Sequence, residues 1–393
     1  MKIVIVGAGV SGMISASILK HKHEVILIEK NSECGRKILA TGNGKCNFWH
    51  TNLRIECYET DYFSKLDKIL MNQEECLNYL FSLGIYPIIK DGYYYPNSKE
   101  ASSIRDVLVN SLDGVNILLD ECVKNVEKKN KGFVVETNKQ KIKCDKVIVS
   151  SGTFASVKEC NTYSLLKGLG HTVNHVEPAL VKLKCNSPYL ADWNGVRTDA
   201  YLELRINGKK KKESMGEIQL TNDGISGICV FDISGEANKA LFKSLNVEVV
   251  INFFPKKDFM KFMNERNLNE PLINSLKTVF NKKLINIFLK EARINGNKLY
   301  NELTKEERER LCNAITHYKV NIIGNNGFIN AQVCTGGVPL EEIDEKSMES
   351  LKTEGLYITG EALDVDGICG GYNMSFAFIT GYLAGLSIGD IND

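Results

Sequence analysis

The N-terminus carries a glycine motif directly after a short apolar run. Residues 3–12 read IVIVGAGVSG, which places Gly7, Gly9 and Gly12 in the pattern G-x-G-x-x-G. In a β-α-β unit, the first glycine allows a tight turn out of the strand and the second lets the backbone approach a pyrophosphate. The third lets the helix pack closely on the sheet, and the free N–H groups of that helix face the phosphates. The motif therefore predicts a dinucleotide site.

An acid at the end of the second apolar run limits the choice of dinucleotide. The run VILIE ends at Glu29. A carboxylate at the tip of the second strand accepts hydrogen bonds from the adenosine ribose, and it would repel the 2′-phosphate of NADP. We therefore expect FAD or NAD at this site. The alternative is a βα turn without a ligand, which gives Glu29 no role.

The composition is that of an ordinary globular protein. The 393 residues are 43% hydrophobic and 25% charged, with a net charge of +1, and this length predicts two or three domains. The near-neutral charge predicts no nucleic-acid partner. The apolar segment 3–19 contains the glycine motif and three serines, so we expect a cytoplasmic protein without a membrane partner. The 12 cysteines show neither C-x-x-C pairs nor zinc spacing, which predicts reduced thiols and no metal site.

Hydrophobic patterns predict an α/β arrangement in the first half of the chain. Helical patterns cover 64–83 and 100–112, and an apolar strand at 146–150 ends at Gly152. An apolar strand that ends in a glycine turn is typical of a buried parallel strand against a cofactor.

The second half begins with a β-rich part and continues with a helical one. Strand candidates occur at 201–206, 217–220, 227–233 and 247–253. Asn207-Gly208 is a hairpin turn signal between the first two. Residues 258–317 carry helical periodicity, with a capping box at Thr304 and Glu307. Strands then return at 318–323 and 328–333.

The C-terminal stretch predicts the second half of the cofactor site. A short strand at 356–359 leads into Gly360-Glu361, and Gly370-Gly371 opens a helix rich in small residues. A helix N-terminus stabilises negative charge, which a reduced flavin carries at N1 and O2 of its ring. We expect the ribityl chain on the acid and the pyrimidine edge at the helix start. A C-terminal αβ unit without a ligand is the alternative.

Several segments of the chain resemble a known family. They are 35–52 (GRKILATGNGKCNFWHTN), 92–104, 219–235 and 335–381. They are similar to the bacterial NAD(P)/FAD-dependent oxidoreductases that include aminoacetone-oxidase-like and 3-dehydro-bile-acid-reductase-like flavoproteins. The resemblance implies an α/β fold, with a glutathione-reductase-type FAD-binding Rossmann-like domain, an inserted β-barrel-like domain and a nested helical domain. The domains expected are 1–190 with 335–393 for FAD binding, 191–256 with 318–334 for the β-rich insert, and 257–317 for the helical insert.

The resemblance also implies roles for individual residues. Glu29 would bind the adenosine ribose, Arg36 and Lys37 would lie along the pyrophosphate, and Val123 would meet adenine through its backbone. The residues expected to approach the flavin ring are Thr41, Gly42, Asn43, Cys46 and Asn47. Those expected at the ribityl chain and the ring are Glu361, Asp366, Gly371, Tyr372 and Asn373. The predicted cofactor site further includes Val10, Ser11, Lys30, Gly152 and Gly360.

One loop departs from the pattern of the family. After the strand at 146–150, the family has a glycine-rich turn with a Tyr-Pro pair and a Thr-Gly-Asp-Gly run. This chain has GTFASVKECNTYS at 152–164 instead. The role of this loop is therefore left open.

No catalytic residue is identifiable from the sequence, because a flavin supplies the redox chemistry itself. Cys46 lacks the second cysteine, four residues away, that disulfide reductases of this fold use, and this favours a small buried contact over a redox role. The six histidines are isolated. A metal pair of His171 and His175 is disfavoured by the β character around Val173.

Only one glycine motif is present, so no separate NAD domain is expected. NAD(P)H would then be a transient reductant, and the other route is reduction by substrate with reoxidation by oxygen. We expect an FAD-dependent oxidoreductase that exchanges hydride between flavin N5 and a small organic substrate. The alternatives are a non-catalytic flavin-binding or redox-sensing protein and an FAD-dependent RNA-modifying enzyme. The sequence defines neither the substrate nor the oligomeric state.

Overall fold

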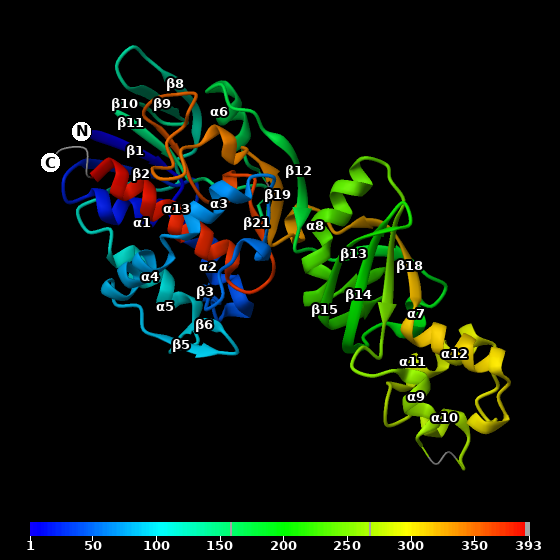
Figure 1. Cartoon of the computed structure of the whole chain (residues 1–393). Coiled ribbons are helices and arrows are strands. Elements are labelled where there is room, and N and C mark those ends of the chain that lie inside the picture. Colours follow the sequence, from blue (N-terminus) through cyan, green and yellow to red (C-terminus); the bar gives the residue numbers. More distant parts are fainter. Residues whose placement is uncertain (158, 267–268, 390–393) are drawn as a thin grey trace. The chain divides into compact units, whose positions relative to one another are not determined.

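A computed structural model describes residues 1–157, 159–266 and 269–389. The chain forms two units (Figure 1): Met1–Val176 with Val333–Asp393, and Glu177–Gln332. Each unit has its own buried hydrophobic core. The two are therefore described separately.

The first unit is built on a five-stranded parallel sheet. The strand order is β20 (Leu356–Ile358), β11 (Lys146–Val149), β1 (Lys2–Val6), β2 (Glu24–Ile28) and β7 (Asn116–Leu118). The strands β20, β11, β1 and β2 are apolar and buried except at the first residue of the last three, as expected for a parallel sheet covered on both faces, whereas the edge strand β7 is only partly buried. The carboxyl ends of the strands lie at one edge, where open α/β sheets bind ligands.

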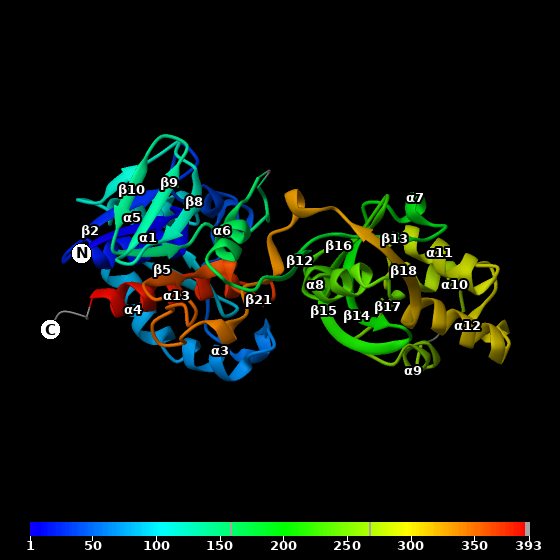
Figure 2. The ribbon, with the colours of Figure 1, turned by 90° about the horizontal axis from the view of Figure 1, so that it is seen from above.

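Helices from the two ends of the chain pack together beside this sheet. α1 (Val10–Leu19) and α13 (Tyr372–Gly389) lie side by side (Figures 1 and 2). A Cβ at Gly381 would lie 2.4 Å from the Ser11 carbonyl oxygen, and the Ser15 hydroxyl donates to the Gly381 carbonyl at 2.8 Å. The small residues of the last helix thus allow its close approach to α1.

The rest of the first unit surrounds this layer with short elements. An antiparallel meander comprises β8 (Val123–Lys128), β9 (Phe133–Thr137) and β10 (Lys141–Cys144). A second small sheet comprises β3 (Trp49–His50), β5 (Pro87–Lys90) and β6 (Tyr93–Pro96). Two two-stranded pairs are β4 (Tyr58–Glu59) with β21 (Asp366–Gly367), and β12 (Asn174–Ala179) with β19 (Val333–Gly337). The remaining helices are α2 (Arg36–Leu39), α3 (Phe63–Leu70), α4 (Gln73–Ser82), α5 (Ala101–Asn110) and α6 (Thr162–Gly168).

The single helix predicted at 64–83 is two helices, α3 and α4. The side-chain amide of Asn72 donates to the carbonyls of Lys68 and Ile69 at 3.1 and 3.3 Å. These are among the carbonyls that the end of a helix leaves without an intrahelical partner. Asn72 therefore ends α3, and α4 begins at the next residue.

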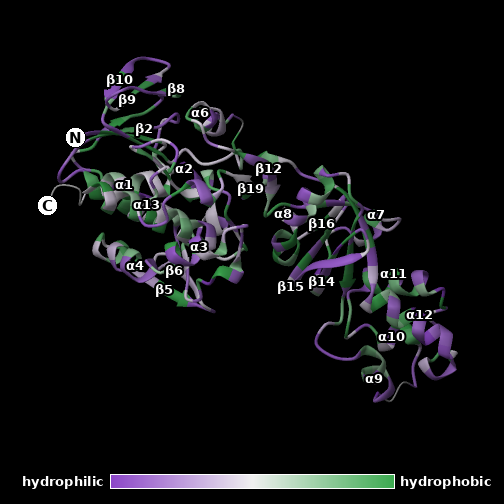
Figure 3. Ribbon diagram, turned by 45° about the horizontal axis from the view of Figure 1, so that its top comes forward, coloured by the Kyte–Doolittle hydropathy of each residue, from purple (hydrophilic) through white to green (hydrophobic). Residues whose placement is uncertain are grey.

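The second unit contains a closed barrel. Its strands are β13 (Leu183–Asn186), β16 (Gly224–Ser226), β15 (Lys209–Thr221), β14 (Arg197–Ile206), β17 (Val247–Asn252) and β18 (Tyr318–Asn325), and β18 pairs with β13 to close it. Asn207 and Gly208, at φ 50° and 77°, form the predicted hairpin turn between β14 and β15. The first half of β15 is hydrophilic, drawn purple in Figure 3, and mostly exposed.

The strand predicted at 227–233 is wrong, because these residues begin helix α8 (Ile228–Phe242). A short apolar run cannot by itself distinguish a strand from a buried helix. A Cβ at Gly227 (φ +103°) would lie 2.3 Å from the Glu217 carbonyl oxygen. The chain can therefore turn here, directly against β15, only with glycine. Val230, Ile233 and Ala237 then recur at helical spacing and are buried.

Short helices occupy the segment between β17 and β18, where helical periodicity was predicted. They are α9 (Phe259–Asn264), α10 (Leu272–Ser275), α11 (Lys282–Ala292) and α12 (Lys305–Thr316), and α7 (Leu190–Trp193) lies earlier in the chain. The capping box is confirmed, since Thr304 and Glu307 exchange side chain-to-backbone hydrogen bonds at 3.0 and 3.1 Å. At 328–333, a 3-10 turn at Phe328–Asn330 precedes β19, so the strand begins only at the end of the predicted range.

The boundary between the units differs from the expected position at residue 190. It falls at Val176/Glu177, because β13 is a strand of the barrel. At the return, Val333 and Cys334 belong to the first unit as part of β19. Among the described residues, no helix combines the length and apolarity needed to cross a bilayer.

Candidate cofactor site

The three glycines of the N-terminal motif differ in what surrounds them. A Cβ at Gly7 (φ +101°) would lie 2.7 Å from the Ser150 carbonyl oxygen, and one at Gly12 would lie 2.1 Å from the Gly7 carbonyl oxygen. At Gly9 the nearest heavy atom would be 3.8 Å away. The packing around Gly7 and Gly12 therefore leaves no room for a side chain at either position. At Gly9, which is the N-cap of α1, the protein leaves this space open.

Glu29 lies beside the glycine turn, directly after β2. Its side chain is buried, and one carboxylate oxygen accepts a hydrogen bond from the Ala8 N–H at 2.9 Å. The other accepts from the backbone and side-chain N–H groups of Asn31 at 2.9 and 2.6 Å. The structure thus brings together the turn and the acid at the carboxyl ends of β1 and β2.

The two predicted halves of the site meet through an ion pair. The Lys37 ammonium on α2 lies 2.6 and 2.9 Å from the two carboxylate oxygens of Glu361. Glu361 belongs to the 3-10 turn Gly360–Ala362, which follows β20. Residues that are far apart in the sequence therefore lie at one edge of the sheet.

The loop after α2 is compact and turns in a left-handed conformation. Gly42, Asn43 and Cys46 have φ values of 56°, 53° and 53°. Cys46 is fully buried, and its sulfur contacts the Met374 sulfur of α13 at 3.8 Å. Burial raises the pKa of the Cys46 thiol to about 11. A buried, protonated thiol agrees with the favoured structural contact rather than with a redox role.

The same loop packs on the start of α13. The Asn47 side-chain amide reaches the carbonyls of Trp49 and Tyr94 at 3.1 and 3.3 Å. A Cβ at Gly371 would lie 2.9 Å from that amide. The Asn373 side chain pairs with the backbone N–H and C=O of Gly367, both at 2.8 Å, and so fixes the turn before the helix.

Aromatic rings surround Tyr372, the first residue of α13. The His50 ring stacks on the Tyr372 ring with centroids 4.9 Å apart, and the Tyr58 hydroxyl donates to the Tyr372 carbonyl at 3.0 Å. Burial lowers the pKa of His50. Asp366 lies nearby, buried on β21.

Two of the predicted cofactor residues, Val123 and Lys30, contact the divergent loop 152–164. The Val123 carbonyl accepts from the Asn161 side-chain amide at 2.6 Å, and the Lys30 ammonium donates to the Glu159 carbonyl at 2.5 Å. Gly152 (φ +70°) begins this loop, with open space at its Cβ position. Arg36 is exposed, and a guanidinium nitrogen lies 3.5 Å from the Asn31 side-chain oxygen.

Three buried hydroxyl groups of the first unit have no hydrogen-bond partner among the described residues: Tyr163, Thr335 and Thr359. Thr359 directly follows β20, and Thr335 lies on β19, which contacts the turn Gly360–Ala362. An unsatisfied buried polar group costs about 1–3 kcal/mol, so such groups are normally satisfied by a ligand or by water. Together with the open space at Gly9, these hydroxyls fit a polar, extended dinucleotide at this edge.

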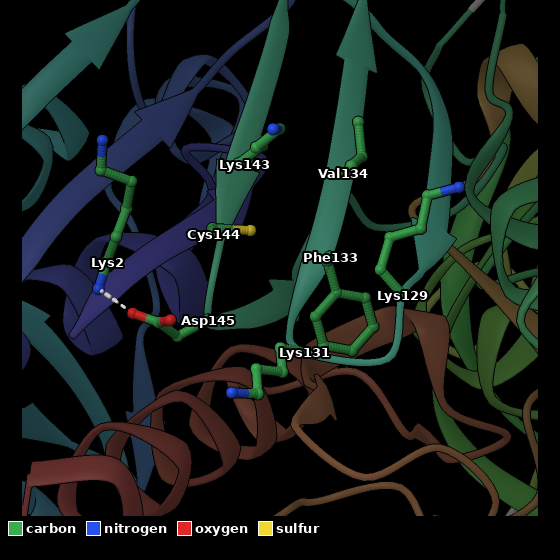
Figure 4. Close-up of a pocket in the computed structure, with 8 residues that line it drawn as sticks. All are labelled: Lys2, Lys129, Lys131, Phe133, Val134, Lys143, Cys144 and Asp145. Atoms are coloured by element: carbon green, nitrogen blue, oxygen red, sulfur yellow. Dashed lines mark hydrogen bonds between the residues drawn. The ribbon is translucent and has the colours of Figure 1, made fainter.

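A separate pocket of about 540 Å³ lies on the meander (Figure 4). It is lined by Lys2, Lys129, Lys131, Phe133, Val134, Lys143, Cys144 and Asp145. The Lys2 backbone N–H donates to the Asp145 carboxylate at 2.6 Å. None of the predicted cofactor residues lines this pocket.

A buried polar network in the first unit was not foreseen from the sequence. His171 lies between Glu342 and Ser350, with 2.7 Å from Nδ1 to the carboxylate and 2.8 Å from Nε2 to the hydroxyl. These partners are 171 and 179 residues away in the chain, so no local pattern could indicate them. Among the described residues, no three His, Cys, Asp or Glu side chains gather as a metal site.

Comparison with known proteins decides the family. The family described as "HI0933-like protein Rossmann domain" matches residues 1–387. The chain belongs to this family. It is a flavoprotein oxidoreductase with a Rossmann-type FAD-binding α/β fold.

Two relatives cover almost the whole chain. One, from Clostridium scindens, is the 3-dehydro-bile acid delta(4,6)-reductase, 36% identical over 98% of each chain. Another, from Escherichia coli, is the ribosomal RNA dihydrouridine synthase, 28% identical over 95% of this chain and 94% of the relative. Because the second is named for an RNA substrate, the absence of a nucleic-acid partner stays a prediction.

Solved structures show the same fold at low identity. The open conformation of a flavocytochrome c3 fumarate reductase has a TM-score of 0.50 and 14% identity, and the match covers 99% of this chain and 78% of that one. The Sdh1 complex of Mycobacterium smegmatis has a TM-score of 0.50 and 11% identity, with 99% and 68% covered.

Proposed function

We propose that the protein is an FAD-dependent reductase that saturates a carbon–carbon double bond conjugated with a carbonyl group in a small organic molecule. The observation that carries this proposal is the 36% identity, over 98% of the chain, to a reductase named for the 4,6 double bonds of a 3-dehydro bile acid. The name of the second relative, dihydrouridine synthase, also denotes saturation of a double bond next to a carbonyl.

The proposed cofactor site follows the carboxyl edge of the parallel sheet. The pyrophosphate would meet the N-terminus of α1 at Gly9, Val10 and Ser11, where backbone N–H groups and the helix dipole favour anions. Glu29 and Val123 would hold the adenosine, and Lys37 and Glu361 the middle of the molecule. We propose the flavin ring between the turn 41–47 and the segment 371–373. Bound flavin supplies the hydride for such a reduction.

The residues placed at the site contribute charge stabilisation and binding, and saturation of the double bond takes up one proton besides the hydride. The first backbone N–H groups of a helix have no intrahelical partner, so the N-terminus of α13, with its positive dipole end, would stabilise negative charge at the predicted position of the pyrimidine edge. Burial raises the pKa of Cys46 to about 11, which disfavours a nucleophilic role for its thiol. We assign no residue as the proton donor.

We further propose NAD(P)H as the reductant, and because the sequence holds only one glycine motif, it would bind transiently. For the domains we propose the limits of the sequence prediction, except that the FAD-binding domain ends at Val176 and resumes at Val333. The competing function is a flavin-binding sensor without turnover. The two differ in whether an electron acceptor reoxidises the reduced flavin rapidly.

The first prediction concerns reduction and reoxidation of the bound flavin. The purified protein is expected to be yellow, and NADH or NADPH is expected to bleach it in anaerobic stopped flow. A 3-oxo steroid with conjugated double bonds should restore the colour, whereas the saturated ketone should not, because only the former has a conjugated carbon–carbon double bond that can accept hydride.

Three results would contradict this function. A colourless protein that also fails to bind added FAD would exclude FAD as the cofactor. A yellow protein that is bleached, and reoxidised only by oxygen with no acceleration by the enone, would favour the sensor. Reoxidation by uridine-containing ribosomal RNA but not by the enone would favour the RNA-modifying alternative.

A further inference from the structure

Tyr163 is a buried tyrosine at the start of α6 whose hydroxyl has no partner among the described residues. Its side chain is 5% exposed, and its ring packs on the Phe154 ring with centroids 5.5 Å apart. Both rings belong to the loop 152–164 that departs from the family pattern. A phenol that is buried as deeply as this normally finds a hydrogen-bond partner.

The strand order places Tyr163 at the same edge as the proposed cofactor site. β11 and β20 are neighbours, and the Thr359 N–H donates to the Val149 carbonyl at 3.1 Å. The loop after β11 and the turn Gly360–Ala362 after β20 therefore leave the sheet side by side. The Thr162 and Ser151 hydroxyls are 2.8 Å apart, which anchors the start of α6 to the carboxyl end of β11.

The groups around Tyr163 keep its hydroxyl protonated. Burial, together with nearby groups that include Glu361 and Asp364, raises the Tyr163 pKa well above its usual value. Both carboxylates have other partners. Glu361 pairs with Lys37, and Asp364 accepts from the Asn174 side chain at 2.7 Å and from the Gly336 N–H at 2.9 Å. Tyr163 therefore presents a donor that these acids do not use.

We propose that the Tyr163 hydroxyl donates a hydrogen bond to bound FAD, in the part of the cofactor that Glu361 also contacts. The ribityl chain and the phosphates both offer acceptor oxygens. A buried water is the competing partner, and FAD titration of the variant below distinguishes it from the cofactor. This inference rests on the proposed cofactor site and adds to it a residue from the divergent loop.

The test is the variant Tyr163→Phe, titrated with FAD as apo-protein while flavin fluorescence is followed. We expect FAD to bind about three- to tenfold more weakly, the loss typical of one hydrogen bond. The melting temperature of the apo-protein should be unchanged or higher, because phenylalanine keeps the ring and removes an unsatisfied hydroxyl. Weaker cofactor binding without a loss of apo stability identifies a contact to the ligand.

The matched control is Tyr79→Phe on α4. The Tyr79 hydroxyl lies 2.8 Å from the Ser17 hydroxyl, so its removal breaks an existing hydrogen bond. We expect a lower apo melting temperature and unchanged FAD affinity for this variant.

Two results with Tyr163→Phe would overturn the inference. One is an FAD affinity within about twofold of wild type, which is less than a hydrogen bond contributes. The other is a fall in apo melting temperature as large as that of the control, which would mean a structural role. A wild-type apo-protein that binds no FAD would instead overturn the proposed function.

Discussion

Gly9→Ala is expected to bind FAD about 10- to 100-fold more weakly while the apo-protein keeps its stability. Gly9 has φ −78° and ψ −171°, a conformation open to any residue, and its Cβ position is clear of protein atoms. Neither backbone strain nor packing therefore requires glycine here, and the exchange should even favour folding slightly. The Cβ would intrude where the pyrophosphate approaches the helix N-terminus, and overpacking of about 1–3 kcal/mol corresponds to this loss of affinity.

Gly12→Ala is the contrasting variant, and it is expected to destabilise the apo-protein itself. Its Cβ would lie 2.1 Å from the Gly7 carbonyl oxygen and 2.6 Å from the Ser150 hydroxyl. Because the closest atom belongs to the backbone, relief requires α1 to move off the sheet, and we expect a loss of about 3 kcal/mol or more. For a unit of this size the apo melting temperature should fall by roughly 6–12 °C.

Differential scanning fluorimetry of the apo-proteins and FAD titration measure both effects. Full FAD affinity in Gly9→Ala would show that the pyrophosphate does not lie at the start of α1. A drop in apo stability equal to that of Gly12→Ala would show that Gly9 has a packing role that the open space at its Cβ position contradicts.

The parts of the fold that the sequence predicts well are those with local signals. The glycine motif, the strand before it and Glu29 lie within 30 residues, and each has a distinct physical requirement. The turn at Asn207-Gly208 and the capping box of Thr304 with Glu307 are equally local. Each of these features could therefore be identified without knowledge of the tertiary structure.

The features that were missed depend on contacts between distant segments. The run 227–233 is a helix because of what it packs against, and β13 belongs to the barrel through its pairing with β16 and β18. The unpartnered hydroxyl of Tyr163 becomes visible only when β11 and β20 are placed side by side. Pattern and spacing carry no information on such contacts.

The network of His171 leads to the second large effect, a loss of stability in His171→Ala. The His171 side chain is fully buried, and it joins the start of the segment after α6 to Glu342 and Ser350. Its removal leaves the buried Glu342 carboxylate with fewer donors, although Lys352 and the Thr172 N–H still contact it. Losing a hydrogen bond to a buried charged group costs about 1.5–3 kcal/mol, which urea denaturation should show.

The same network predicts lower stability in acid. Burial lowers the folded-state pKa of His171 below 6.5, so its contribution to stability is present above pH 6.5 and is lost as the pH falls through the folded pKa. Burial acts to raise the pKa of Glu342, but hydrogen bonds from Lys352, Thr172 and His171 outweigh it and hold the pKa below 4.5. The contribution of Glu342 is lost at still lower pH, so protonation of either group in acid lowers the stability of the fold.

The matched control is His21→Ala, which removes an exposed histidine from the same unit. We expect this variant to keep both the stability and the acid sensitivity of wild type between pH 8 and pH 5. In contrast, His171→Ala should be less stable at pH 8 and lose less on acidification, because the buried imidazole that must be charged is gone. Equal slopes of stability against pH for His171→Ala and wild type would show that the acid sensitivity does not originate at this histidine.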